Sequence, residues 1–190
     1  NAMLTGYIQQ GDHQSALGLI GKMHLEGIQP DKVLYLCILQ ACTGIASLDE
    51  GRLAHDQIIR GEIGLDSLLG STLMDMYSKC GAMDKAQEVF EKLLVQTVVS
   101  WTALITGYAQ LGESESVFLI LRRMLENGFK ANFVTFINIL NVCSNAGLVE
   151  KGQAYFELFG SNEYGIVYTP EHYACMVDLL ARAGHIIMAI

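Results

Sequence analysis

Cysteine and histidine have the widest chemical repertoire in this sequence, and their spacing argues against a site built from them. No cysteine pair has C-x-x-C spacing, and no histidine lies at the distance that zinc fingers use. An odd number of cysteines without a pairing pattern indicates buried or half-buried free thiols in a reducing compartment. The cysteines are Cys37, Cys42, Cys80, Cys143 and Cys175. The scattered histidines are predicted to lie on the surface: His13, His24, His55, His172 and His185.

No catalytic motif accompanies these residues. The sequence contains no phosphate-binding P-loop, no G-x-S-x-G nucleophile elbow and no H-E-x-x-H zinc motif. It also lacks an H-x-E motif followed by P-C-x-x-C, which marks the nucleotide deaminases. The sequence therefore predicts a binding protein that is not an enzyme and that uses no metal or other cofactor.

The composition indicates a folded, helical chain. A hydrophobic content of 51% and a mean hydropathy of +0.31 exclude a disordered chain, and 190 residues fit one ordinary domain. Only two prolines occur, which favours helices over a turn-rich sheet. No apolar run reaches the roughly 18–20 residues that a membrane span needs. No leader opens the sequence, so a targeting peptide is expected outside it, and Asn1-Ala2 before Met3 is either native or a cloning remnant.

Residues 98–132 predict a helical hairpin around which the other elements are organised. Apolar residues at helical spacing form one stripe over 103–109 and a second over 117–124. Gly112 interrupts the first helix, and Asn127 and Gly128 end the second, because both residue types tolerate a left-handed conformation. Two such short helices cannot bury their apolar faces alone. The hairpin therefore needs neighbours.

Internal repeats supply these neighbours. Residues 4–11 match residues 105–112, and residues 39–43 match residues 140–144 at the same spacing. Residues 74–81 match residues 177–184 at a slightly larger spacing, so an insertion is expected within 159–169. Hairpins over 32–66, 67–97 and 98–132 share one plan, which predicts an all-α fold, an α-solenoid with a concave surface lined by one helix of each pair. Each second helix is expected to begin near an acid, which suits the helix dipole: Asp12, Asp49, Asp84, Glu113 and Glu150.

The repeats also resemble a known family. Residues 98–110, 133–136, 73–81 and 171–180 closely resemble plant pentatricopeptide repeat proteins of the PLS class. The resemblance covers the whole chain and implies helix-turn-helix repeats stacked as a right-handed superhelix. It divides the chain into a P-type repeat at 1–31 without its first residues, then L-type 32–66, S-type 67–97, P-type 98–132, L-type 133–169 and a truncated S-type repeat at 170–190. The last two resemble the repeats that precede the C-terminal extension of organellar RNA-editing factors.

The resemblance implies that each repeat binds one nucleotide of single-stranded RNA. The fifth and last residues of a repeat select the base, and the second residue sandwiches it. The fifth/last pairs are Asn1/Asp31, Leu36/Asp66, Ser71/Thr97, Thr102/Asn132 and Ile137/Thr169. The stacking residues are Val33, Leu68, Val99 and Val134.

Elementary hydrogen bonding supports part of this code. A carboxylate accepts the ring N–H of uracil or guanine, whereas an asparagine amide donates to the bare ring nitrogen of adenine or cytosine. Asp31 should therefore favour U or G, and Asn132 should favour A or C. The family rule that fifth-position Asn selects pyrimidines and Thr purines then predicts 5′-U-N-N-A for the first four repeats. Leu36 and Ile137 cannot hydrogen-bond a base, so both L-type repeats should discriminate poorly, and Ser71/Thr97 has no assigned base.

The charge balance opposes nucleic-acid binding. The net charge is −8 and the pI about 5.0, whereas phosphate neutralisation normally supplies most of the affinity. Most acids fall in the second helices or turns, which are expected to face outward. Lys79 and Arg182, beside Asp75 and Asp178, lie at equivalent points of the S-type repeats. Either they contact phosphate or they mark a solvated helix end, and weak binding is expected in both cases.

Each predicted site residue also has a structural interpretation. The apolar second residues could pack at the helix start, and Asp31 and Asp66 could be N-caps as well as base contacts. Aromatic residues at helical spacing are predicted to be core rather than stacking platforms: Tyr77, Trp101, Tyr108 and Phe136.

Two functions follow from these observations. The first is sequence-selective binding of single-stranded RNA in a mitochondrial or chloroplast RNA-editing or processing factor. The second is a protein-interaction solenoid that docks accessory editing proteins, which the apolar Leu36 and Ile137 favour. Because incomplete terminal repeats expose core surface, end-to-end or helix-swapped self-association is also expected. No membrane partner is expected.

Overall fold

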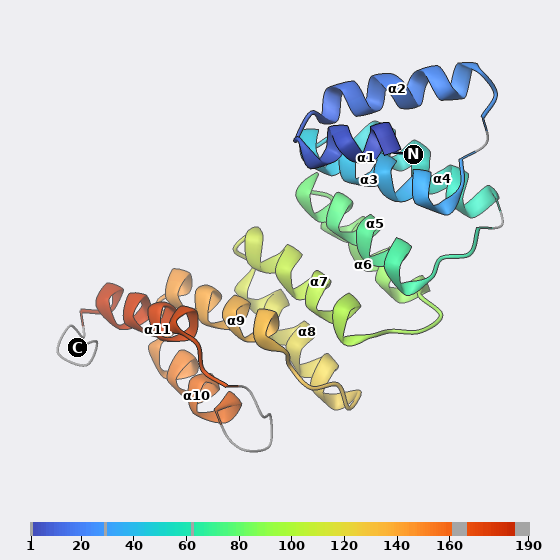
Figure 1. Ribbon diagram of the computed structural model, residues 1–190. Helices are drawn as coiled ribbons and strands as arrows, with labels where there is room; N and C mark the ends of the chain where they lie inside the picture. The colour runs from blue at the N-terminus through green and yellow to red at the C-terminus, as the bar shows by residue number, and fades with distance from the viewer. Residues whose placement is uncertain (1, 29, 62, 161–166, 185–190) are drawn as a thin grey trace. The chain divides into compact units, whose positions relative to one another are not determined.

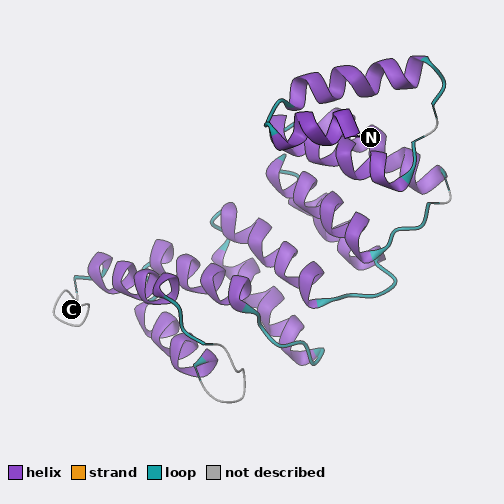
Figure 2. Ribbon diagram, viewed as in Figure 1, coloured by secondary structure: helices purple, strands orange, loops and turns teal. Residues whose placement is uncertain are grey.

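The structure is a computed structural model that describes residues 2–28, 30–61, 63–160 and 167–184. Those ranges contain α-helices and no strand, which confirms the predicted all-α class (Figure 2). The helices are α1 (Ala2–Gln9), α2 (His13–Leu25), α3 (Lys32–Ile45), α4 (Leu48–Arg60), α5 (Ser67–Lys79), α6 (Met83–Lys92), α7 (Val98–Gln110), α8 (Ser114–Glu126), α9 (Phe133–Ala146), α10 (Val149–Phe159) and α11 (Pro170–Arg182). None of these helices combines the length and apolarity needed to cross a membrane.

The helices form hairpins in two compact units, Asn1–Gln96 and Thr97–Ile190, called here the first and second unit. Within each unit the first helices of successive hairpins pack against one another (Figure 1). These first helices are α1, α3 and α5 in one unit and α7, α9 and α11 in the other. Each second helix packs on its own first helix, and most also contact the first helix that follows in the same unit. This stacking of helix-turn-helix repeats is the predicted α-solenoid.

Glycines end the helices of the central hairpin as predicted. Gly112 has a φ of +75° and Gly128 a φ of +79°, values that an L-residue with a side chain seldom adopts. At the end of α8, the backbone N–H of Gly128 donates to Leu125 and that of Phe129 donates to Met124. The chain can therefore reverse within a few residues at both sites.

The cores contain the aromatic residues that were predicted to lie there. Trp101 and Phe136 are fully buried, and Tyr77 and Tyr108 are nearly so. Three free cysteines are buried and the other two, Cys80 and Cys175, are half-buried, as predicted. Burial raises the pKa of the Cys42 thiol to about 12, which makes it a poor nucleophile. The predicted insertion at 159–169 falls largely on residues 161–166, outside the described residues.

His172 contradicts the prediction that the histidines lie on the surface. It is fully buried in the first turn of α11, where its ring stacks on Phe136 with centroids 4.5 Å apart. The edge of Phe133 approaches it at a centroid distance of 4.7 Å. Its Nδ1 accepts a hydrogen bond of 3.1 Å from the backbone N–H of Thr169. The prediction was wrong here because aromatic side chains of α9 cover a position that sequence alone places at an open helix start.

We expect the burial of His172 to make the second unit less stable in mild acid. Burial lowers the pKa of His172 below its ordinary 6.5, and the nearby Glu171 carboxylate only partly opposes this. Below pH 6.5 the unfolded chain therefore binds a proton at this histidine more readily than the folded chain does. The free energy of unfolding is highest above pH 6.5 and decreases as the pH falls from 6.5 toward the lowered pKa of the folded state. A proton on Nδ1 would also displace the N–H of Thr169.

Thermal unfolding followed by circular dichroism between pH 7.5 and pH 5 tests this expectation. The His172→Phe variant keeps a ring of similar shape that does not titrate, so its melting temperature should fall less than that of the wild type. His55, which is half-buried in the first unit and bonded to Tyr77, titrates in both proteins and cancels in the difference. Equal falls in both proteins would contradict the role given to His172.

Candidate nucleic-acid interface

The last residues of the predicted repeats lie immediately before the first helices, where they act as N-caps. The side chains of Asp31, Asp66 and Asn132 accept the backbone N–H of the third helical residue at 2.7, 3.0 and 2.8 Å. Thr97 caps α7 in the same way at 3.3 Å. The capping alternative for Asp31 and Asp66 is therefore confirmed. One oxygen of each side chain is held by the helix, and the rest of the group is positioned at its N-terminus.

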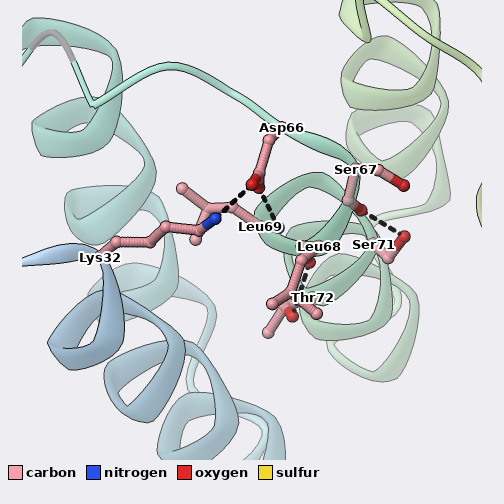
Figure 3. Close-up of polar contacts among 7 residues, drawn as sticks. All are labelled: Lys32, Asp66, Ser67, Leu68, Leu69, Ser71 and Thr72. Atoms are coloured by element: carbon pink, nitrogen blue, oxygen red, sulfur yellow. Dashed lines mark hydrogen bonds and ion pairs between the residues drawn. The ribbon is translucent and has the colours of Figure 1, made fainter.

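A lysine already occupies the second oxygen of Asp66. Lys32, the first residue of α3, forms an ion pair with Asp66 Oδ2, while Oδ1 accepts the N–H of Leu69 (Figure 3). The hydrogen bond from Lys32 holds the pKa of Asp66 below its ordinary range. The negative charge of Asp66 is thus offset by Lys32, and a base N–H would have to compete with Lys32 for the carboxylate.

The predicted stacking residues are apolar side chains that remain exposed. Val33, Leu68, Val99 and Val134 are 50%, 57%, 61% and 47% exposed. Each is the second residue of its helix and so lies beside the N-cap of that helix. Exposed apolar residues are ordinary when scattered singly, but here they recur at one position of four successive first helices. Each of these four helices therefore presents an exposed apolar side chain beside a polar N-cap.

The fifth residues of the repeats differ in how exposed they are to a ligand. Leu36, Ser71 and Ile137 are half-buried, whereas Thr102 is only 7% exposed. The hydroxyl of Ser71 donates to the carbonyl of Ser67 at 2.7 Å, so its proton is used within the helix (Figure 3). The fifth residues therefore do not form four equivalent base contacts.

Thr102 and Asn132 are brought together through Thr135, which is not among the predicted site residues. The hydroxyl oxygens of Thr102 and Thr135 lie 2.9 Å apart, and Thr135 Oγ1 lies 3.0 Å from Asn132 Oδ1. Thr135 follows Asn132 by three residues, which is the capping-box spacing and a signal that could have found it. No comparable signal points to Lys32 as a partner of Asp66.

The residues of the other predicted pairs have different surroundings. Asn1 lies outside the described residues, and Ser71 and Thr97 belong to different units. Thr169 is engaged with His172, whose Nδ1 lies 3.0 Å from its hydroxyl. The Thr102/Asn132 pair, by contrast, is joined through hydrogen-bonded side chains.

The predicted phosphate contacts are already in ion pairs. Lys79 Nζ lies 3.1 Å from Asp75, and Arg182 Nε lies 2.9 Å from Asp178. Asp178 also accepts a hydrogen bond from Ser144 of the neighbouring helix. Both side chains of each pair are about half exposed, so the pairs contribute little to stability but offset the positive charge locally.

Models of repeat families match three parts of the chain. A PPR repeat family model matches residues 96–145, and a pentatricopeptide repeat domain model matches residues 1–45. A PPR repeat model matches residues 71–96. The matches lie in both units and on both helices of the hairpins.

Similar proteins occur in Arabidopsis thaliana. A mitochondrial pentatricopeptide repeat-containing protein is 38% identical over 190 residues, which are 100% of this chain and 21% of the relative. A chloroplastic one is 34% identical over 197 residues, or 98% of this chain and 22% of the relative. A third pentatricopeptide repeat-containing protein is 38% identical over 185 residues, which are 97% of this chain and 25% of the relative. The chain thus spans about a quarter of the length of these relatives.

Solved structures share the fold. The maize pentatricopeptide repeat protein PPR10, in complex with an 18-nt psaJ RNA element, aligns with a TM-score of 0.78 at 20% identity over 95% of this chain and 27% of that one. The PPR domain of Arabidopsis thaliana protein-only RNase P 1, in complex with tRNA, aligns with a TM-score of 0.71 at 14% identity over 95% of this chain and 96% of that domain. With the repeat models distributed along both units and relatives of the same kind matching almost every residue, the chain belongs to the pentatricopeptide repeat family.

Proposed function

We propose that the chain binds single-stranded RNA with one base per repeat. The observation that carries this proposal is the recurrence, at the start of α3, α5, α7 and α9, of a polar N-cap next to an exposed apolar second residue. The apolar residue offers a surface to the face of a base, and the polar cap lies where the edge of that base would be. The solved relatives in complex with an RNA element and with tRNA support this use of the fold.

The proposed repeats keep the boundaries predicted from sequence: 1–31, 32–66, 67–97, 98–132, 133–169 and 170–190. Their register is supported by the helices, since α3, α5, α7, α9 and α11 begin at Lys32, Ser67, Val98, Phe133 and Pro170. A shift of one residue would move the N-caps out of the last position and the exposed residues out of the second. Both would then lose their proposed roles.

The proposed base order remains 5′-U-N-N-A. Asn132 uses its carbonyl oxygen as the cap, so its amide nitrogen is the group left to meet adenine. Asp31 is exposed and caps α3 through Oδ1, and a carboxylate is a suitable acceptor for the ring N–H of uracil. Asp66 is paired with Lys32 and its fifth-position partner Leu36 is apolar, so the second base should be weakly selected.

Phosphate contacts should add little to the affinity. The chain carries a net charge of −8, and the proposed phosphate residues Lys79 and Arg182 each share their charge with an aspartate. Because the non-specific part of RNA affinity comes mainly from released counterions, we expect weak binding that is detectable only at low salt.

Alanine at the exposed apolar positions is expected to weaken RNA binding without affecting folding. Stacking on aromatic side chains is worth roughly 1–3 kcal/mol per base, and valine offers less surface, so Val99→Ala and Val134→Ala should each reduce affinity about fivefold. Fluorescence anisotropy at low salt with a labelled RNA containing U-N-N-A measures this. Leu119→Ala is the matched control. Leu119 is 54% exposed, as the valines are, but it lies on α8, the second helix of its hairpin, which is not part of the proposed RNA site. If Leu119→Ala weakens binding as much, or the wild type binds no RNA, the proposal fails.

We also propose an organellar role in RNA editing or processing. Relatives named mitochondrial and chloroplastic support the location, and the resemblance of the last two repeats to those of editing factors supports the process. The role is one of targeting, with catalysis supplied from outside this repeat tract. The half-buried apolar Leu36 and Ile137 favour accessory proteins as additional partners of the L-type repeats.

A further inference from the structure

Thr135 occupies the centre of a hydrogen-bonded chain beneath the start of α9. It is fully buried, and three polar contacts converge on it. Its backbone N–H donates to Asn132 Oδ1 at 2.8 Å, and its hydroxyl lies 3.0 Å from the same oxygen. The Thr102 hydroxyl, from the neighbouring helix α7, lies 2.9 Å from Thr135 Oγ1.

The direction of each hydrogen bond follows from the groups involved. The carbonyl oxygen of an asparagine side chain can only accept, so the Thr135 hydroxyl donates to Asn132 Oδ1. A hydroxyl has one proton, so Thr135 must accept from Thr102. The chain therefore runs from the Thr102 hydroxyl to the Thr135 hydroxyl to Asn132 Oδ1.

We propose that Thr135 is a positioning residue that sets the hydrogen-bonding polarity of Asn132 toward the base. This rests on the proposed function. Two donors from Thr135 hold Asn132 Oδ1, and the amide nitrogen makes no hydrogen bond among the described residues. The outward group is then a donor, which fits the ring nitrogen of adenine or cytosine and opposes the ring N–H of guanine or uracil. Thr102 is nearly buried, and its hydroxyl donates to Thr135.

The hydrogen bonds at Asn132 differ from those at the N-caps of other repeats. After Asp31 and Asp66 the equivalent third position holds Leu34 and Leu69, which provide only a backbone N–H. A carboxylate accepts in either orientation and needs no side chain to orient it. After Thr97 the equivalent Ser100 hydroxyl instead donates to the Thr97 backbone carbonyl at 2.9 Å.

The variant Thr135→Val tests the proposal because it keeps the shape and removes the hydroxyl. One hydrogen bond to Asn132 is lost and the amide can rotate, so the ratio of adenine to guanine affinity at the fourth base should fall about fivefold. Thr106→Val is the matched control: Thr106 also joins α7 to α9, through a 2.7 Å bond to Asn138. It donates to the Thr102 backbone carbonyl but hydrogen-bonds neither Asn132 nor Thr135. It should change the melting temperature similarly and leave the base ratio unchanged.

A double variant separates an effect on the orientation of Asn132 from a general loosening of the contact between α7 and α9. In an Asn132→Asp background the carboxylate accepts in any orientation, so adding Thr135→Val should leave the base ratio as it was. Thr135→Ser, which keeps the hydroxyl, should restore the wild-type preference and serves as the test if Thr135→Val does not fold. The proposal is overturned if Thr135→Val keeps the wild-type ratio, if Thr106→Val lowers it equally, or if Thr135→Ser behaves as valine does. Should the wild type show no base preference at all, the proposed function falls as well.

Discussion

Asn132→Asp is expected to reverse the base preference of the fourth repeat from adenine to guanine. The two side chains have nearly the same shape, and both can cap α9 by accepting the N–H of Thr135. The outward group changes from an amide that donates to a carboxylate oxygen that accepts, which suits the ring N–H of guanine. A well-placed base contact discriminates by about 1–3 kcal/mol, so the affinity ratio between the two RNAs should change roughly tenfold or more.

The measurement compares labelled single-stranded RNAs that differ only in A or G at that base, by fluorescence anisotropy at low salt. Asn145→Asp is the matched control, because Asn145 is exposed near the end of α9 and the variant adds the same charge. It should weaken both RNAs equally and leave the ratio unchanged. Base-dependent binding by the wild type without a reversal in Asn132→Asp would show that the proposed repeat register is wrong.

Phe136→Ala is expected to destabilise the second unit by about 3–5 kcal/mol, the usual cost of removing a buried aromatic ring. Phe136 lies at the meeting point of α9, α10 and α11 and is fully buried. Its ring centroid lies 4.9 Å from that of Phe159 on α10 and 4.5 Å from that of His172 on α11. Alanine would leave a cavity among groups that cannot all move into it. Since a domain is typically stable by only about 5–15 kcal/mol, this loss removes much of the margin.

Urea denaturation followed by circular dichroism measures the change in the free energy of unfolding. Val134→Ala is the matched control, because Val134 lies two residues away on the same helix and is 47% exposed. It should change stability little while weakening RNA binding. Phe136→Ala should lower stability strongly but leave RNA binding unchanged at temperatures where the variant remains folded. A loss below about 1 kcal/mol in Phe136→Ala would mean that the aromatic cluster does not hold the three helices together.

The periodicity of the sequence determined which helices form and which faces they bury. Helical spacing of apolar residues identified the hairpin of α7 and α8, its glycine ends, and the burial of Trp101 and Phe136. These features are local, because a helix repeats every 3.6 residues and a glycine acts on its own turn. The capping roles of Asp31 and Asp66 were equally within reach, since a cap bonds to a group only three residues ahead.

Only the tertiary structure decided which side chains meet between helices. The pairing of Lys32 with Asp66, the link from Thr102 to Thr135, and the burial of His172 under Phe133 join residues more than thirty positions apart. A helical pattern shows which face of a helix is covered. It does not show the register at which the neighbouring helix covers it, because that depends on how both sets of side chains pack together. The polarity of Asn132 toward a base therefore became visible only when α7 and α9 were placed side by side.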